Sequence, residues 1–122
     1  MTDTNPSSDI LEIKQVIEHY FDGTHYSDGD KMALAFAEGS QIIGKTMRAE
    51  RDDWIEDIKK RKSPASQGAP YAYRIQAIEV TDDIAQARMF VPINDMEFTD
   101  VATLLKLEDG WKIVAKAFFR AK

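Results

Sequence analysis

The 122-residue chain contains no cysteine. This absence excludes disulfide bonds, thiolate metal sites and a cysteine nucleophile. Histidine is scarce as well: the two histidines show no recognisable metal-ligand spacing. There is also no Gly-rich phosphate loop and no nucleophile elbow. The sequence therefore predicts neither a metal site nor a bound cofactor.

Long hydrophobic runs and an excess of basic charge are also missing. No apolar stretch approaches the roughly 20 residues of a membrane-spanning helix, and the N-terminus has no signal-peptide pattern. The net charge is −5, whereas a nucleic-acid surface needs a basic stripe. We therefore expect a cytoplasmic protein that binds neither membrane nor nucleic acid.

What the chain does contain is the composition of one ordinary globular domain. Hydrophobic residues make up 43% and charged residues 30%, and 122 residues suffice for one sizeable core. Residues 1–7 are polar, and we predict that they form a disordered tail. Residues 8–122 are predicted to form a single domain.

Helical periodicity dominates the first half of the chain. A first helix is predicted from an N-cap at Ser8 to about Tyr26, and a second follows the cap Asp30 to Ala37. A third helix is predicted from Glu50 to Lys62, with acids at its start and bases at its end, which complements the helix dipole. The apolar stripe of the first helix comprises Ile10, Ile13, Ile17, Tyr20, Phe21 and Thr24.

Strand patterns dominate the second half. One or two short strands are predicted within residues 41–47, before the third helix. Four antiparallel strands are predicted after it, at residues 71–81, 84–93, 98–107 and 111–119. Helices followed by a run of strands indicate an α+β fold with the helices packed on one face of a curved, mostly antiparallel sheet.

The dipeptide Asp109-Gly110 predicts the last hairpin and its register. If these two residues form the loop, Thr103 lies opposite Lys116 and Asp100 opposite Phe119. Since side chains alternate between faces, Asp100 and Lys116 would then point to opposite sides of the sheet and could pair only across a bulge. Both faces of the hairpin are largely apolar, yet the helices can cover only one. We therefore predict a homodimer through the other face.

The order of these segments resembles the nuclear transport factor 2-like superfamily. The likeness covers roughly residues 9–120. It lies in the segments IKQVIEHYFDG, the helix with Trp54, PYAYRIQAIEVTDDIAQARM and FTDVATLLKLEDGWKIVAKAFF. Within the superfamily, the chain is most similar to the small bacterial branch described as "putative lumazine-binding", related to SnoaL-like polyketide cyclases and ketosteroid isomerases. The resemblance implies a cone-shaped fold, a pocket between the helices and the concave sheet face, and a dimer through the sheet.

Asp100 is the candidate catalytic residue. A carboxylate in an apolar cavity has its ionisation disfavoured, as a general acid or base requires, and relatives with isomerase or cyclase activity use acidic residues in the cone. The structural alternative places Asp100 at a strand edge, bound to backbone or to Arg120. Lys116, with Thr103 beside it, is a candidate ligand-binding residue, and its alternative is a lysine packed at the sheet interface.

Aromatic residues and one histidine complete the predicted pocket. Tyr20 and Trp54 carry a polar tip on core-facing helical stripes, and Tyr73 lies near the expected pocket mouth. Such residues also serve as plain core with one satisfied donor. His25, on the flank of the first helix, is the last candidate, although a position near the helix end also suits its charge.

Three functions are compatible with these residues. The first is binding of a small, largely apolar or aromatic molecule. The second is a metal-independent isomerase, dehydratase or cyclase that uses Asp100 as general acid or base. The third is an association module that dimerises and binds no ligand. We rank ligand binding first, because the sequence contains few paired catalytic groups.

Overall fold

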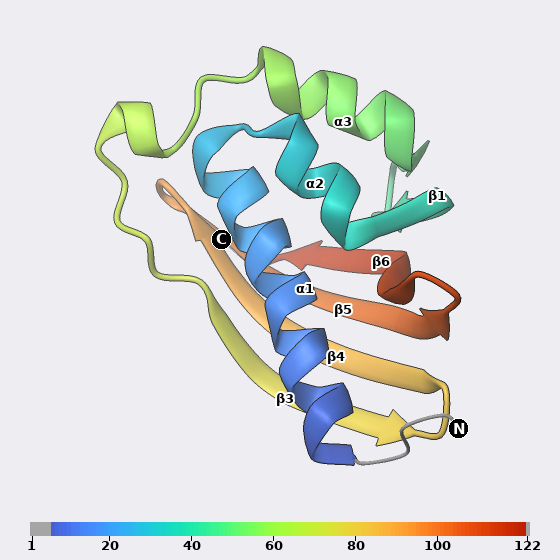
Figure 1. Ribbon diagram of the computed structural model, residues 1–122. Coiled ribbons are helices and arrows are strands. Elements are labelled where there is room, and N and C mark those ends of the chain that lie inside the picture. Colours follow the sequence, from blue (N-terminus) through green and yellow to red (C-terminus); the bar gives the residue numbers. More distant parts are fainter. Residues whose placement is uncertain (1–5, 122) are drawn as a thin grey trace.

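Three helices lie against one face of a curved six-stranded sheet, as Figure 1 shows for the computed structural model, which describes residues 6–121. The helices are α1 (Pro6–Tyr26), α2 (Gly29–Ala35) and α3 (Arg51–Lys60), with a 3-10 turn η1 at Ala65–Gln67. The strands are β1 (Phe36–Ile43), β2 (Arg48–Glu50), β3 (Arg74–Thr81), β4 (Ile84–Ile93), β5 (Met96–Leu107) and β6 (Gly110–Arg120). The predicted α+β fold is confirmed.

The sheet has the strand order β2-β1-β6-β5-β4-β3. All neighbours are antiparallel except β1 and β6, which run parallel. The last strand of the chain therefore lies in the middle of the sheet, between an early strand and its own hairpin partner. No helix within residues 6–121 is long and apolar enough to cross a membrane.

The core lies between the helices and the concave face of the sheet. The predicted stripe of α1 is buried there, since Ile13, Ile17 and Tyr20 are at most 3% exposed. They face inward-pointing residues of the central strands, including the fully buried Leu104 and Ile113. The 3.6-residue period of α1 thus predicts its buried face correctly.

Several element boundaries differ from the prediction. Helix α1 begins at Pro6, so residues 6 and 7 of the predicted tail are helical, and residues 1–5 lie outside the described residues. Asp28, rather than Asp30, caps α2, because its side chain accepts hydrogen bonds from two backbone N–H groups. Helix α2 ends at Ala35 and β1 follows it at once, five residues earlier than expected.

The register of the last hairpin was predicted wrongly. The loop residues are Glu108 and Asp109, and Leu107 pairs with Gly110. Only Gly110 has a positive φ, +110°, whereas the predicted Asp109-Gly110 loop needed it at both residues. Since the turn is displaced by one residue, every later pair of the hairpin is displaced with it.

A bulge in β6 changes the register a second time. Leu104 pairs with Ile113, but the next pair is Thr103 with Ala115, so Val114 has no partner residue in β5. An extra residue in one strand reverses the facing of every side chain beyond it. Lys116 is therefore opposite Ala102 and on the same face as Asp100, two residues along β5. The prediction that Asp100 and Lys116 point to opposite sides is wrong, because it assumed no bulge.

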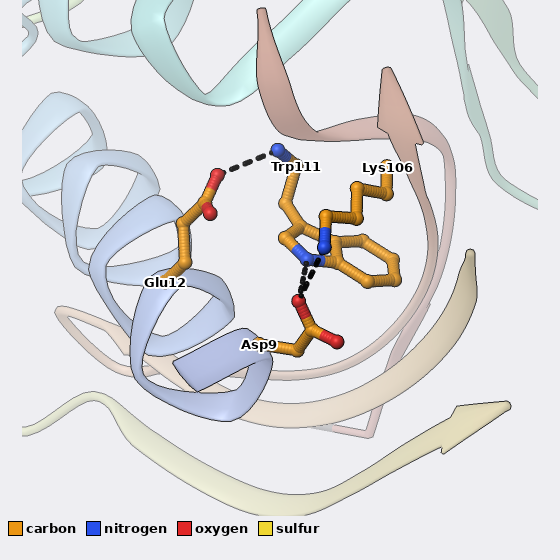
Figure 2. Close-up of polar contacts among 4 residues, drawn as sticks. All are labelled: Asp9, Glu12, Lys106 and Trp111. Carbon is orange, nitrogen blue, oxygen red and sulfur yellow. Dashed lines mark hydrogen bonds and ion pairs between the residues drawn. The ribbon is translucent and has the colours of Figure 1, made fainter. Parts of the chain in front are cut away.

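The first turns of α1 are fastened to this hairpin by four polar residues (Figure 2). Oδ1 of Asp9 accepts hydrogen bonds from the indole Nε1 of Trp111 and from Nζ of Lys106, both at 3.0 Å. Oε2 of Glu12 accepts from the backbone N of Trp111 at 2.7 Å. A Cβ on Gly110 would lie 2.6 Å from the same oxygen, so only glycine admits this approach. We call Asp9, Glu12, Lys106 and Trp111 the helix–hairpin clamp.

The clamp predicts a specific acid sensitivity. The hydrogen bond from Trp111, followed by that from Lys106, lowers the pKa of Asp9 below its ordinary value. A depressed folded pKa gives stability that is present above the unfolded value, near 3.9, and lost as the pH falls through the folded pKa. Asp9→Asn should therefore unfold at lower urea concentration than the wild type at pH 7, with a smaller difference near pH 3.

Urea titrations at both pH values measure this effect. Asp95→Asn, in the exposed turn between β4 and β5, is the matched control and should follow the wild type at both. An Asp9→Asn deficit that is as large at pH 3 as at pH 7 would show that the charge of Asp9 contributes nothing.

Candidate functional site: a cavity with a buried Tyr–Asp–Lys triad

A cavity of about 130 Å³ lies between the helices and the concave sheet face. Its wall comes from α1, α3 and the loop after it, β1 and its following loop, and strands β4 to β6. Exposed residues Met47 and Arg61 stand on its solvent side. The wall is mainly apolar, with a few polar groups. Its residues are Tyr20, Thr24, Ile42, Met47, Trp54, Ile58, Arg61, Val91, Ile93, Phe98, Asp100, Lys116 and Phe118.

Three of these polar groups form a buried triad. Oη of Tyr20 donates a hydrogen bond to Oδ2 of Asp100 at 2.5 Å and accepts one from Nζ of Lys116 at 2.8 Å. Nζ of Lys116 lies 3.6 Å from the same carboxylate oxygen. The three residues are only 1–4% exposed. Because a buried charge is stable only when paired and hydrogen-bonded, each member depends on the other two.

Aromatic rings surround the ammonium group of this triad. Nζ of Lys116 lies 4.4 Å from the centre of the Trp54 ring and 4.5 Å from that of Tyr20, with Phe118 at 5.8 Å. Ring faces attract a cation, most strongly when it is desolvated. The rings therefore hold Lys116 in place at the cavity wall.

Burial shifts the titration of two triad members. The pKa of Tyr20 is raised well above its ordinary value, mainly by burial and then by the neighbouring charge of Asp100, so its hydroxyl stays protonated. Burial also lowers the pKa of Lys116, against the opposing effect of Asp100. The cavity wall thus contains a protonated hydroxyl fixed between Asp100 and Lys116, and an amine whose charged form is less stable than it is in water.

Four of the predicted site residues come together here, namely Tyr20, Trp54, Asp100 and Lys116. The two helical residues come from the predicted apolar stripes. The strand residues share the cavity only because of the bulge, which no hydrophobic pattern indicates.

Thr103 was predicted beside Lys116, but it lies on the opposite face of β5. It pairs with Ala115 and with Gln86, and it lines a shallow groove together with Glu79 on the outer side of the sheet. The displaced turn and the bulge together explain this error.

His25 and Tyr73 were also predicted in the pocket, but they form a separate cluster near the C-terminal end of α1. Nδ1 of His25 lies 2.7 Å from Oη of Tyr73, whose ring stacks on Phe21 at 5.4 Å. Burial raises the pKa of Tyr73 to about 12. Neither residue lines the cavity. Within the described residues, no three His, Asp or Glu side chains are grouped as metal ligands would be.

Thr24, Met47 and Arg61 were missed as cavity residues. Thr24 lies one helical turn beyond Tyr20 on the predicted stripe, so its position was visible in the sequence. The basic residues at the end of α3, Arg61 among them, were explained by the helix dipole. Nothing in the sequence shows that the chain after this helix borders the cavity. Met47 follows β1 in a loop whose path depends on the sheet order.

Removal of both charges from the triad should cost less than the two single removals added together. Lys116→Met leaves the Asp100 carboxylate buried without its cation, and we expect the free energy of unfolding to fall by about 3–5 kcal/mol. The double variant Lys116→Met/Asp100→Leu should lose less than the sum of the single variants, because no buried charge remains. Urea unfolding of all three variants measures this coupling.

Lys60→Met, at the exposed end of α3, is the control and should stay within about 0.5 kcal/mol of the wild type. Additive losses in the double variant would contradict the pairing.

Comparison with known proteins supports the fold. An NTF2-like protein of unknown function from Shewanella baltica OS155 superposes with a TM-score of 0.87 at 24% identity, covering 98% of this chain and 99% of that one. A ketosteroid isomerase-like protein from Erwinia carotovora atroseptica SCRI1043 superposes with a TM-score of 0.72 at 13% identity, covering 93% and 97%. No curated protein matches the chain.

The sequence also matches a family model over residues 8–119, nearly its whole length. The family is described as "Putative lumazine-binding". The NTF2-like neighbour from Shewanella baltica superposes on the three helices and curved sheet over nearly the whole chain. The chain belongs to the family described as "Putative lumazine-binding", and it has the fold of the NTF2-like structures.

Proposed function

We propose that the protein binds a small, largely apolar or aromatic molecule in the cavity beside the Tyr20–Asp100–Lys116 triad. The observation that supports this proposal is the composition of the cavity wall, in which apolar side chains surround a few fixed, buried polar groups. Ligand sites typically combine these features, since the apolar wall supplies affinity and the polar groups orient the ligand. The family name is consistent with a heterocyclic ligand.

Catalysis at Asp100 is the second candidate. The buried carboxylate at the cavity wall, with a tyrosine donor next to it, is the observation that favours an isomerase, dehydratase or cyclase. However, Oδ2 of Asp100 already accepts from Tyr20 and faces Lys116, so Oδ1 is the oxygen left for a substrate proton. We rank binding first on this ground. Turnover of a bound ligand by the wild type but not by Asp100→Asn would reverse the order.

If a ligand binds in the cavity, it should raise the melting temperature, and a variant whose cavity is filled should lose this rise. Indole, toluene and lumazine are suitable probes, and a ligand at a hundred times its Kd should stabilise the fold by about 2.7 kcal/mol. Ile93→Trp, which fills the cavity wall, should abolish the shift. Ile84→Trp is the matched control, because it makes the same change on the same strand at an exposed position away from the cavity, and it should retain the shift.

Differential scanning fluorimetry of the wild type and both variants provides the readout. If no probe shifts the melting temperature of the wild type, or if Ile93→Trp responds as the wild type does, the binding proposal fails.

We also propose that two copies of the chain associate through the outer face of the sheet. No helix of the described residues covers this face (Figure 1), and it carries apolar side chains on its central strands, with Val101 38% and Phe119 53% exposed. Arg88 and Glu79 flank this region on β4 and β3. Charges of both signs beside an apolar centre make the surface complementary to itself, as a two-fold interface requires.

Phe119→Glu should therefore convert the protein from dimer to monomer at micromolar concentration, because a carboxylate replaces an exposed apolar ring of the proposed interface and loses hydration when the interface forms. Light scattering coupled to gel filtration measures the mass. Leu11→Glu, at a 68% exposed position of α1 on the other side of the molecule, should leave the dimer intact. A wild-type protein that is monomeric under these conditions would contradict the proposal.

A further inference from the structure

The cavity contains more positive than negative charge. Three ionisable residues other than tyrosine line it: Arg61, Asp100 and Lys116. Asp100 and Lys116 offset each other at 3.6 Å. Arg61 makes no ion pair with any other described residue. The wall therefore has one uncompensated positive charge, although the whole chain has a net charge of −5.

The polar groups left over at the wall are mainly donors. The hydroxyl of Thr24 is buried at 8% exposure and lies next to that of Tyr20. Lys116 directs two of its three donors at Tyr20 and Asp100, so one donor is left for a ligand. Arg61 adds a guanidinium, which has donors and no acceptor.

The size of the cavity limits the apolar part of the ligand. Its volume of about 130 Å³ is close to the ~150 Å³ of an engineered apolar cavity that accommodates benzene. The apolar side chains Ile42, Val91 and Ile93 in its wall suit a ring rather than a polar chain. One ring therefore fits within the wall, and a second ring would extend past Met47 and Arg61.

We infer that the ligand is a monoanion, a single-ring planar carboxylate whose ring lies among the apolar side chains and whose carboxylate meets Lys116 and Arg61. This inference rests on the binding function proposed above and specifies its ligand class. One negative charge matches the excess at the wall. A second would lack a counter-charge, and a cationic ligand would be repelled by Arg61 and Lys116.

The titration of Lys116 agrees with this geometry. Burial lowers its pKa, and the nearby positive charge of Arg61 acts in the same direction. A carboxylate placed between the two cations would oppose both effects and favour the ammonium form. Binding should therefore be accompanied by a stronger interaction at Lys116 than a neutral isostere can make.

Benzoate and its neutral isostere benzamide separate charge from shape. In isothermal titration calorimetry at pH 7 and low salt, the wild type should bind benzoate at least about tenfold more tightly than benzamide. Arg61→Gln should weaken the binding of benzoate more than that of benzamide, and so remove most of this preference. Lys62→Gln is the matched control: it removes a neighbouring exposed charge that does not line the cavity, and it should retain the preference.

The outcomes distinguish this inference from the binding function. If benzamide binds as tightly as benzoate, or if Arg61→Gln keeps the full preference, the anionic ligand class is wrong and the binding function stands. The same holds if indole binds and neither isostere does. If benzoate, benzamide, indole, toluene and lumazine all fail to bind, both the inference and the proposed function are overturned.

Discussion

The extra residue at Val114 is the constraint on which the cavity depends. Without it, the side chains of β6 beyond Ile113 would alternate onto the other face, and Lys116 would lie on the outer side of the sheet. Asp100 would then be buried without a cation, and Tyr20 would lose the donor to its oxygen. The bulge thus brings a charged residue of a central strand to the concave face. The same change of facing brings Phe118 into the cavity wall.

The triad both stabilises the fold and offers polar groups to a ligand, two requirements that usually oppose each other. A buried lysine and a buried aspartate both lose hydration, and the protein compensates through one shared tyrosine oxygen and the faces of two aromatic rings. Each of these partners also forms part of the cavity wall. The interactions that stabilise the fold and the surface offered to a ligand are therefore the same side chains, and the cavity is preformed.

The sequence predicted the parts of the fold that follow from periodicity. The stripe of α1 and the inward positions of α3 recur at helical spacing, so Tyr20 and Trp54 were correctly placed on the core side. Thr103 was misplaced, because register depends on which residue of a turn takes a positive φ and on whether a strand contains an extra residue. Both are local backbone choices that leave the hydrophobic pattern nearly unchanged. Asp9 and Glu12 show a related limit: acids in the first turn of a helix suit its dipole and need no further partner, yet the structure uses them to bind residues about a hundred positions away.

The helix–hairpin clamp also has a consequence for the order in which this chain can fold. Trp111 and Asp9 are 102 residues apart, and β6 pairs with β1 in the middle of the sheet. During synthesis, α1 and β1 therefore leave the ribosome long before their partners exist. Contacts of such separation form late, because a long loop must first close. Until β6 emerges, the part of the apolar face of α1 that packs against this strand stays uncovered.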